Sequence, residues 1–284
     1  QRLVLGYPTP VRDEETGTIF LSYGQFPESA SRDVEFSETA NGGRGNHLVW
    51  VRSSRDHGVT WSERRQVVFP NRPGETSDGL YWRHAEPGPG TGIQLKWQKD
   101  DRLNGRLVVP AKRAGSKTPD GPTTTEPFVT GGPDANESEV VELTDGRLLL
   151  DARQSEGNYR RRHISTDGGI TWSANRPDDI PLTRVDGSLA RYSARRAGHE
   201  RDRILFSAPQ GDGGLNRNNL ALWTSYDEGQ SFVNPKLIHR GFAAYSVLQR
   251  LSDGTIGVLV ETTGTADAAY GAITFYRIDL NELE

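Results

Sequence analysis

The chain has 284 residues with a formal net charge of -4, and it contains no cysteine and no methionine. The lack of cysteine excludes disulfides and thiolate metal sites. The charge gives no broad electrostatic reason to bind nucleic acid or an anionic membrane, and no apolar run approaches the ~18 residues of a membrane span. We expect one domain over residues 1–284.

Short apolar segments bounded by turn residues predict β-strands along the chain. In chain order they cover residues 18–23, 47–51, 106–109, 139–143, 147–150, 203–207 and 255–260. Asp145-Gly146 lies between two of these segments and Asp253-Gly254 directly before another, and both predict tight hairpins, because glycine accepts a positive φ. No stretch keeps a period of 3.6 residues long enough to predict a helix, so the expected fold class is all-β.

A turn motif recurs along the chain and sets the expected architecture. SSRDHGVTWS at 53–62 returns as STDGGITWS at 165–173 and more loosely as SYDEGQSF at 225–232. The first interval is close to twice the second, which predicts a degenerate copy near 112–122. The unit is near the length of a four-stranded propeller blade, and the chain has room for about five.

The motif itself is interpreted as structural. In the pattern S-x-D-x-G-x-T-W, the Ser and Asp side chains bond backbone groups of the turn, and the aromatic ring packs beneath the hairpin. Asp56, Asp167 and Asp227 are therefore predicted to hold turns rather than to catalyse. The basic run 160–162, just before the second copy, is expected to lie at the edge of a blade rather than to contact phosphate.

Four further segments resemble the sialidase (neuraminidase) superfamily. Its members carry the same S-x-D-x-G-x-T-W turn, called the Asp box, on a six-bladed β-propeller. GPGTGIQL at 88–95, followed by NGRLVVPA at 104–111, looks like the third blade of bacterial sialidases. NESEVVELTDGRLLLDAR at 136–153 is similar to the segment with a catalytic Glu near its start and a substrate Arg at its end. NRNNL at 216–220 resembles the next substrate Arg, and AAYS at 243–246 resembles the catalytic Tyr.

The resemblance implies an exo-α-sialidase that removes terminal sialic acids with retention of configuration. Arg153 and Arg217 would hold the sugar carboxylate, because planar guanidinium groups bind carboxylates bidentately. Tyr245 would be the nucleophile and Glu137 its general base, since a neutral phenol is not repelled by the substrate's carboxylate. Glu261 would orient an arginine.

No cofactor is implied, and the six histidines show no paired metal-ligand spacing, so we expect no metal site. The expected partner is a sialylated glycan, which favours a secreted or cell-surface location. Neither nucleic acid nor a membrane span is expected.

The opening of the chain departs from the family pattern. The first blade normally carries an Arg-Ile-Pro segment, whose arginine completes a triad, and a downstream Asp that acts as acid/base. Residues 7–21 resemble the start of the second blade instead. We therefore expect an N-terminally truncated propeller with about five of its six blades. Asp33 is the nearest stand-in for the acid, in what reads as a surface loop.

Two other functions stay open. One is a sialidase-like propeller that binds a sugar or is catalytically inactive. The other is a glycosidase with two carboxylates, which would pair Glu137 with Glu139 or Glu142. On one strand Glu142 would face away from Glu137, and Glu139 would stand beside it rather than across a cleft, so this pairing is disfavoured.

Overall fold

The computed structural model describes residues 3–27, 48–67, 81–116, 124–127, 135–154, 157–173, 176–211, 216–264 and 269–283. Within these ranges the regular structure consists of nineteen strands and three 3₁₀ turns, η1 (Asp101–Leu103), η2 (Arg195–Ala197) and η3 (Leu280–Glu282). The predicted all-β class is confirmed. Asp33 lies outside the described residues, as does the expected degenerate box beyond Ser116.

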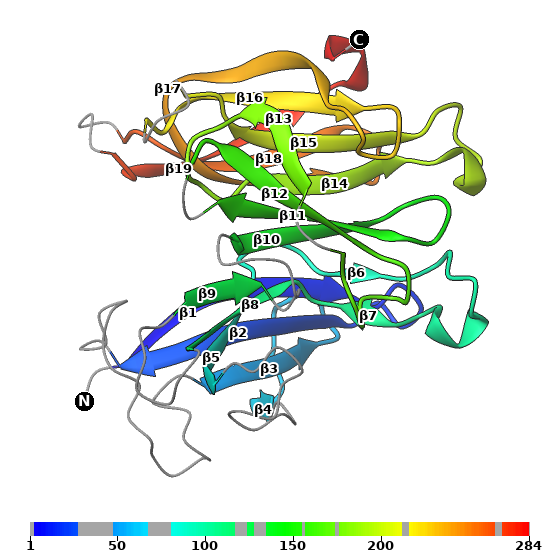
Figure 1. Ribbon diagram of the computed structural model, residues 1–284, viewed down its shortest axis with the longest axis vertical. Helices are drawn as coiled ribbons and strands as arrows, with labels where there is room; N and C mark the ends of the chain where they lie inside the picture. The colour runs from blue at the N-terminus through cyan, green and yellow to red at the C-terminus, as the bar shows by residue number, and fades with distance from the viewer. Residues whose placement is uncertain are drawn as a thin grey trace.

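The first three sheets are antiparallel and follow the chain (Figure 1). The first contains β1 (Leu3–Arg12), β2 (Ile19–Pro27), β3 (Leu48–Ser54) and β4 (Arg65–Val67). The second contains β5 (Tyr81–Pro87), β8 (Ala111–Ser116) and β9 (Thr124–Pro127), with a separate hairpin of β6 (Ile93–Gln94) and β7 (Leu107–Val108). The third contains β10 (Ala135–Glu142), β11 (Leu148–Gln154), β12 (Tyr159–Ser165) and β13 (Arg176–Pro181).

The last sheet has six strands because one strand belongs to two blades. It contains β14 (Ser188–Ser193), β15 (Arg203–Pro209), β16 (Asn218–Ser225), β17 (Val233–Arg250), β18 (Ile256–Thr262) and β19 (Ala272–Ile278). The 18-residue β17 pairs with β16 up to Phe242 and with β18 from Ala243 onward. With β17 counted in both, the described sheets form five blade-like units, as the repeat predicts.

The hydrophobic core lies between neighbouring blades. Every residue of β15 is buried, because this strand has another blade against each of its faces. Ile204 and Phe206 pack toward the third sheet with Leu149, whereas Leu205 packs on the opposite face with Ile256. This alternation follows from the two-residue period of a strand. The arrangement holds β10, β14 and β17 side by side, with β10 at the middle of the molecule (Figure 1).

The three Asp boxes form the predicted turns. In the first, the Ser54 hydroxyl donates to Asp56 Oδ1 at 2.8 Å and accepts the Gly58 amide at 2.8 Å. The Asp56 carboxylate accepts the Thr60 hydroxyl at 2.5 Å and the Thr60 amide at 2.9 Å, and these bonds lower the pKa of Asp56 to about 2. Gly58 has φ 88°, which a side chain disfavours. Asp167 and Asp227 bond their turns in the same way.

The expectation that the basic run 160–162 edges a blade is wrong. Its strand, β12, lies between β11 and β13, and Arg160 and Arg162 are 0% and 2% exposed. Arg160 Nε donates to Asp151 Oδ2 at 2.5 Å, and its Nη1 donates to the Val185 carbonyl at 2.8 Å. Side chains of an internal strand enter the space between blades, so these arginines need a buried acid, which Asp151 supplies.

Candidate active site

Three of the predicted site residues meet in the structure, although they lie on three strands. The Tyr245 hydroxyl on β17 lies 2.6 Å from each carboxylate oxygen of Glu137 on β10. Arg153 Nη1 on β11 donates to Glu137 Oε2 at 2.7 Å and to the Tyr245 hydroxyl oxygen at 2.9 Å. The phenol therefore contacts a base and a fixed positive charge together.

Irregular strand pairing aims two of these side chains. The register of β10 against β11 shifts between Ala135 and Ser138, around Glu137. The register of β17 against β18 shifts between Ala243 and Ser246, around Tyr245. Such bulges redirect a side chain out of the regular alternation and occur often beside active sites.

The local charges keep the phenol protonated at rest. Burial, and after it the negative charge of Glu137, raises the pKa of Tyr245 well above its ordinary value. Burial alone would lower the pKa of Arg153, but the charge of Glu137, its hydrogen bond and the other negative groups nearby together outweigh burial and raise that pKa. A phenol with a raised pKa would need a base to act as a nucleophile, and the Glu137 carboxylate lies against the Tyr245 hydroxyl.

Arg217 approaches Tyr245 from another direction. Its guanidinium carbon lies 5.3 Å from the centre of the Tyr245 ring. Its Nη1 donates to the Tyr270 hydroxyl at 2.9 Å, and its Nη2 donates to the Arg184 carbonyl at 3.1 Å. Arg153 and Arg217 thus flank Tyr245, one at the hydroxyl and one at the ring.

Glu261 makes a different contact from the one that we expected. Its Oε2 accepts the backbone N–H of Tyr245 at 3.1 Å, across the β17–β18 pairing. Within the described residues no hydrogen bond joins Glu261 to an arginine. Glu261 therefore contacts the backbone of the bulge that carries Tyr245.

Comparisons with known proteins identify the family. The model of the BNR repeat-like domain matches residues 2–258. The chain is 31% identical over 270 residues to a sialidase of Micromonospora viridifaciens, a match that covers 89% of this chain and 39% of that protein. It is 34% identical over 215 residues to a sialidase of Vibrio cholerae serotype O1, covering 62% of this chain and 27% of that protein. The chain belongs to the sialidase superfamily. It spans less than half the length of these two relatives.

Solved structures confirm the sialidase-type β-propeller fold. The Hadza microbial sialidase Hz136 is 22% identical with a TM-score of 0.73, covering 99% of this chain and 54% of that chain. Trypanosoma rangeli sialidase in complex with 2,3-difluorosialic acid, a covalent intermediate, is 17% identical with a TM-score of 0.67, covering 98% of this chain and 45% of that chain.

This member of the sialidase superfamily has a further carboxyl group at the site, which the sequence did not reveal. Asp186, between β13 and β14, is 4% exposed, and its Oδ1 lies 3.9 Å from Arg160 Nη2. Burial, and after it the charge of Glu137, raises the pKa of Asp186 well above its ordinary value. In sequence this residue reads as an ordinary turn acid before Gly187.

The remaining acids of β10 serve other contacts. Glu139 is 1% exposed, and its Oε2 accepts the Thr91 amide at 3.3 Å. The Glu142 carboxylate accepts the Trp97 amide at 2.9 Å. Neither contact gives Glu137 a second carboxylate across a cleft, so nothing here favours the two-carboxylate glycosidase.

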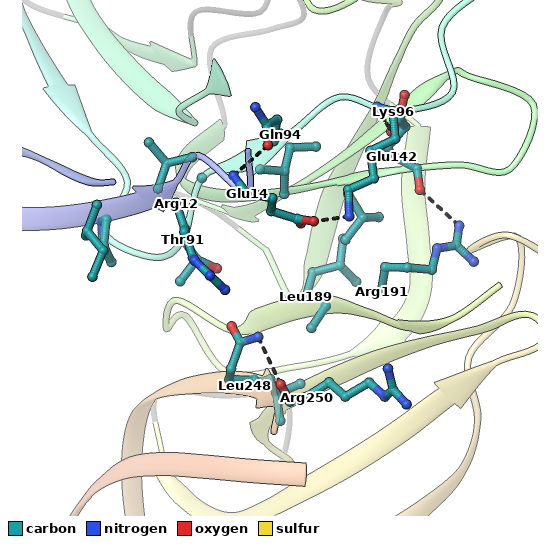
Figure 2. Close-up of a pocket in the computed structure, with 18 of the residues that line it drawn as sticks. Arg12, Glu14, Thr91, Gln94, Lys96, Glu142, Leu189, Arg191, Leu248 and Arg250 are labelled. Carbon is teal, nitrogen blue, oxygen red and sulfur yellow. Dashed lines mark hydrogen bonds and ion pairs between the residues drawn. The ribbon is translucent and has the colours of Figure 1, made fainter. Parts of the chain in front are cut away.

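A cavity of about 550 Å³ is lined by the C-terminal ends of β10 and β17 and by the middle of β14 (Figure 2). Leu189 and Leu248 contribute apolar wall, and a 2.7 Å ion pair between Lys96 and Glu14 crosses one side. Tyr245 and Glu137 do not line this cavity, so it is distinct from the candidate active site.

Within the described ranges, we find no group of three or more acidic or histidine side chains placed to hold a metal ion. In the same ranges, none of the helices has the length and apolar character needed to cross a membrane.

Proposed function

We propose that the chain is the catalytic propeller of an exo-α-sialidase, which hydrolyses terminal sialic acids from glycoconjugates with retention of configuration. The observation that carries this proposal is the contact of the Tyr245 hydroxyl with Glu137 at 2.6 Å, with Arg153 bonded to both groups. The sialidases among its relatives support the substrate class. A secreted or cell-surface location would bring the enzyme to such glycans.

Arg153 and Arg217 bind the carboxylate of the sugar in this proposal. Both flank Tyr245, and sialic acid carries its carboxylate on the anomeric carbon. Holding the carboxylate between the two guanidinium groups therefore brings the anomeric carbon toward the phenolic oxygen.

Catalysis begins with a proton transfer from Tyr245 to Glu137. The Tyr245 oxygen then attacks the anomeric carbon, and the glycosidic bond breaks with its electron pair passing to the aglycone oxygen, which takes a proton from a general acid. Water next attacks the anomeric carbon and gives a proton to the conjugate base of that general acid. The bond from the anomeric carbon to the Tyr245 oxygen breaks with its electron pair passing to that oxygen, which takes its proton back from Glu137. Two successive inversions give net retention. The covalent intermediate seen in Trypanosoma rangeli sialidase supports this route. Asp33 is the first residue to test as the acid.

The test compares release of 4-methylumbelliferone from its sialoside by the wild-type chain and by Tyr245→Phe. This change removes the hydroxyl and leaves the ring beneath Arg217, so turnover should vanish while sialic acid still binds. Tyr159→Phe is the matched control, because Tyr159 is an exposed tyrosine on β12. Binding without turnover by the wild type would favour the sugar-binding propeller, and neither binding nor turnover would refute the site.

A further inference from the structure

The connection between β13 and β14 is buried, although connections usually run over the surface. Its residues that are at most 4% exposed are Leu182, Thr183, Val185 and Asp186. Arg217 donates to the Arg184 carbonyl at 3.1 Å, and Arg160 donates to the Val185 carbonyl at 2.8 Å. A substrate arginine and a core arginine thus hold the same short loop.

The end of the loop is fixed by close packing. A Cβ atom at Gly187 would lie 2.7 Å from Cε2 of the Phe206 ring, which is closer than side chains approach. Only glycine fits there without a shift of β15. The preceding residue, Asp186, is therefore held in a fixed position beside β15.

The carboxyl group of Asp186 is buried without a close basic partner in the described part of the chain. Its Oδ1 has no hydrogen-bond partner within the described residues, and Arg160 Nη2 at 3.9 Å is too far to donate. Arg160 already bonds Asp151 through Nε at 2.5 Å. The Oδ1 atom of an ionised Asp186 would thus lack the donor that a buried carboxylate oxygen needs.

Charged groups from three strands influence whether Asp186 holds its proton. They are Glu137 and Glu139 from β10, Asp151 and Arg153 from β11, and Arg160 from β12. Four carboxyl groups, including Asp186, therefore share this region with two arginines. The burial and the charge of Glu137 that raise the pKa of Asp186 act in the same sense, and both favour its protonated form.

We propose that Asp186 is a specificity-determining residue of the proposed sialidase site: the site binds the sugar carboxylate only while Asp186 carries a proton. This inference rests on the proposed function. Protonated Asp186 leaves the positive charge of Arg153 available to the substrate. Ionised Asp186 competes for that charge and repels the incoming carboxylate.

Proton and ligand binding are linked, so the effect is reciprocal. A bound carboxylate is one more negative charge beside Asp186, and it raises the proton affinity of that group further. Above the pKa of Asp186 in the free protein, sialic acid binding should take up one proton, and its Kd should rise about tenfold per pH unit. Below that pKa, binding should take up no proton at Asp186.

The experiment is calorimetric titration of the full chain with sialic acid, in buffers of different ionisation enthalpy, across a pH series. The wild type should take up a proton over an upper pH window, and Asp186→Asn should bind there without that uptake and with a smaller rise in Kd. Glu139→Gln is the comparison variant, because Glu139 is as buried as Asp186 and the two carboxyl groups interact. It should keep the uptake of one proton, but over a pH window shifted downward, since it removes a negative charge that favours protonated Asp186.

The outcomes separate the two proposals. Binding by the wild type without proton uptake, or uptake that persists in Asp186→Asn, overturns the role of Asp186 and leaves the sialidase site standing. No binding by the wild type at any pH overturns both. Because the wild-type titration alone tests the coupling, the inference stays falsifiable even if Asp186→Asn fails to fold.

Discussion

Replacing Glu137 by Gln should separate its role as a base from its role as a contact. The side chain keeps its shape, but it loses the charge that accepts from Tyr245 at 2.6 Å and from Arg153 at 2.7 Å. Loss of a positioned general base typically lowers kcat by about 10²- to 10⁴-fold, or roughly 3–5 kcal/mol. Two charge-assisted hydrogen bonds weaken as well, so we also expect a stability loss of about 1–3 kcal/mol.

The same substitution should make the Tyr245 phenol easier to ionise, although it slows the reaction. The negative charge of Glu137 helps to raise the pKa of Tyr245, so removing that charge should lower this pKa even though turnover falls. A phenol that ionises more easily yet reacts more slowly would show that the base matters for proton transfer rather than for ionisation at rest.

Three measurements check this reasoning. Sialoside hydrolysis gives kcat, the ultraviolet absorbance of tyrosinate against pH gives the phenol titration with Tyr245→Phe as reference, and urea unfolding gives stability. A kcat within a few-fold of wild type would refute the assignment of Glu137 as the base. A tyrosine titration that moves upward would refute the electrostatic account.

The remaining predictions concern the box turns and the rim of the site. Asp227→Ala should lower the free energy of unfolding by about 1–3 kcal/mol and leave kcat/KM unchanged, because Asp227 accepts the Ser231 amide at 2.9 Å and the Ser231 hydroxyl at 2.6 Å. Urea unfolding measures the stability loss, and a loss of activity in the folded variant would contradict a purely structural role. Gly229→Ala should destabilise by about 1–3 kcal/mol, since its φ is 77° and a Cβ would lie 2.3 Å from Leu149 Cδ2; an unchanged urea midpoint would count against this packing. The pKa of Asp56 is lowered to about 2 in the folded protein, so the ionised carboxylate contributes its full stability above the unfolded pKa of about 4. That contribution is lost as the pH falls through the folded pKa. Asp56→Asn should therefore make the free energy of unfolding depend less on pH between about 4 and 2, and an unchanged dependence would refute this. Tyr270→Phe removes the hydroxyl that accepts from Arg217 at 2.9 Å and should raise KM several-fold with kcat within about twofold; a kcat effect alone would assign Tyr270 another role.

Local patterns predicted most of the fold. Short apolar segments gave the strands, and both Asp-Gly hairpins join paired strands, β10 to β11 and β17 to β18. The box motif predicted its own hydrogen bonds because all the partners lie within one turn. Features that depend on a distant partner were not predictable in this way. Arg160 was expected at an edge, because a run of charge reads as exposed until its strand is known to be internal.

The proximity of three candidate site residues was predictable from the sequence, but their individual contacts were not. Resemblance pointed to Tyr245, Glu137 and Arg153, which do lie together. The bulges that aim two of them depend on pairing with neighbouring strands, and single-strand alternation cannot reveal a register shift. Asp186 was missed because its burial depends on a loop whose anchors, Arg160 and Arg217, are distant from it in the sequence.

Because β17 pairs with strands of two blades, it makes the junction between those blades rigid. It leaves one blade at Phe242 and enters the next at Ala243, two residues before Tyr245, with no loop in between. A tilt of one blade against the other would have to bend paired backbone on both sides, and it would carry Tyr245 away from Arg217 at the start of β16. The distance between the proposed nucleophile and the proposed carboxylate-binding arginine is thus fixed by continuous strand pairing, since the Ala243 amide also donates to the Arg217 carbonyl at 3.0 Å. If the proposed function is right, adaptation to aglycones of different size comes from other parts of the rim.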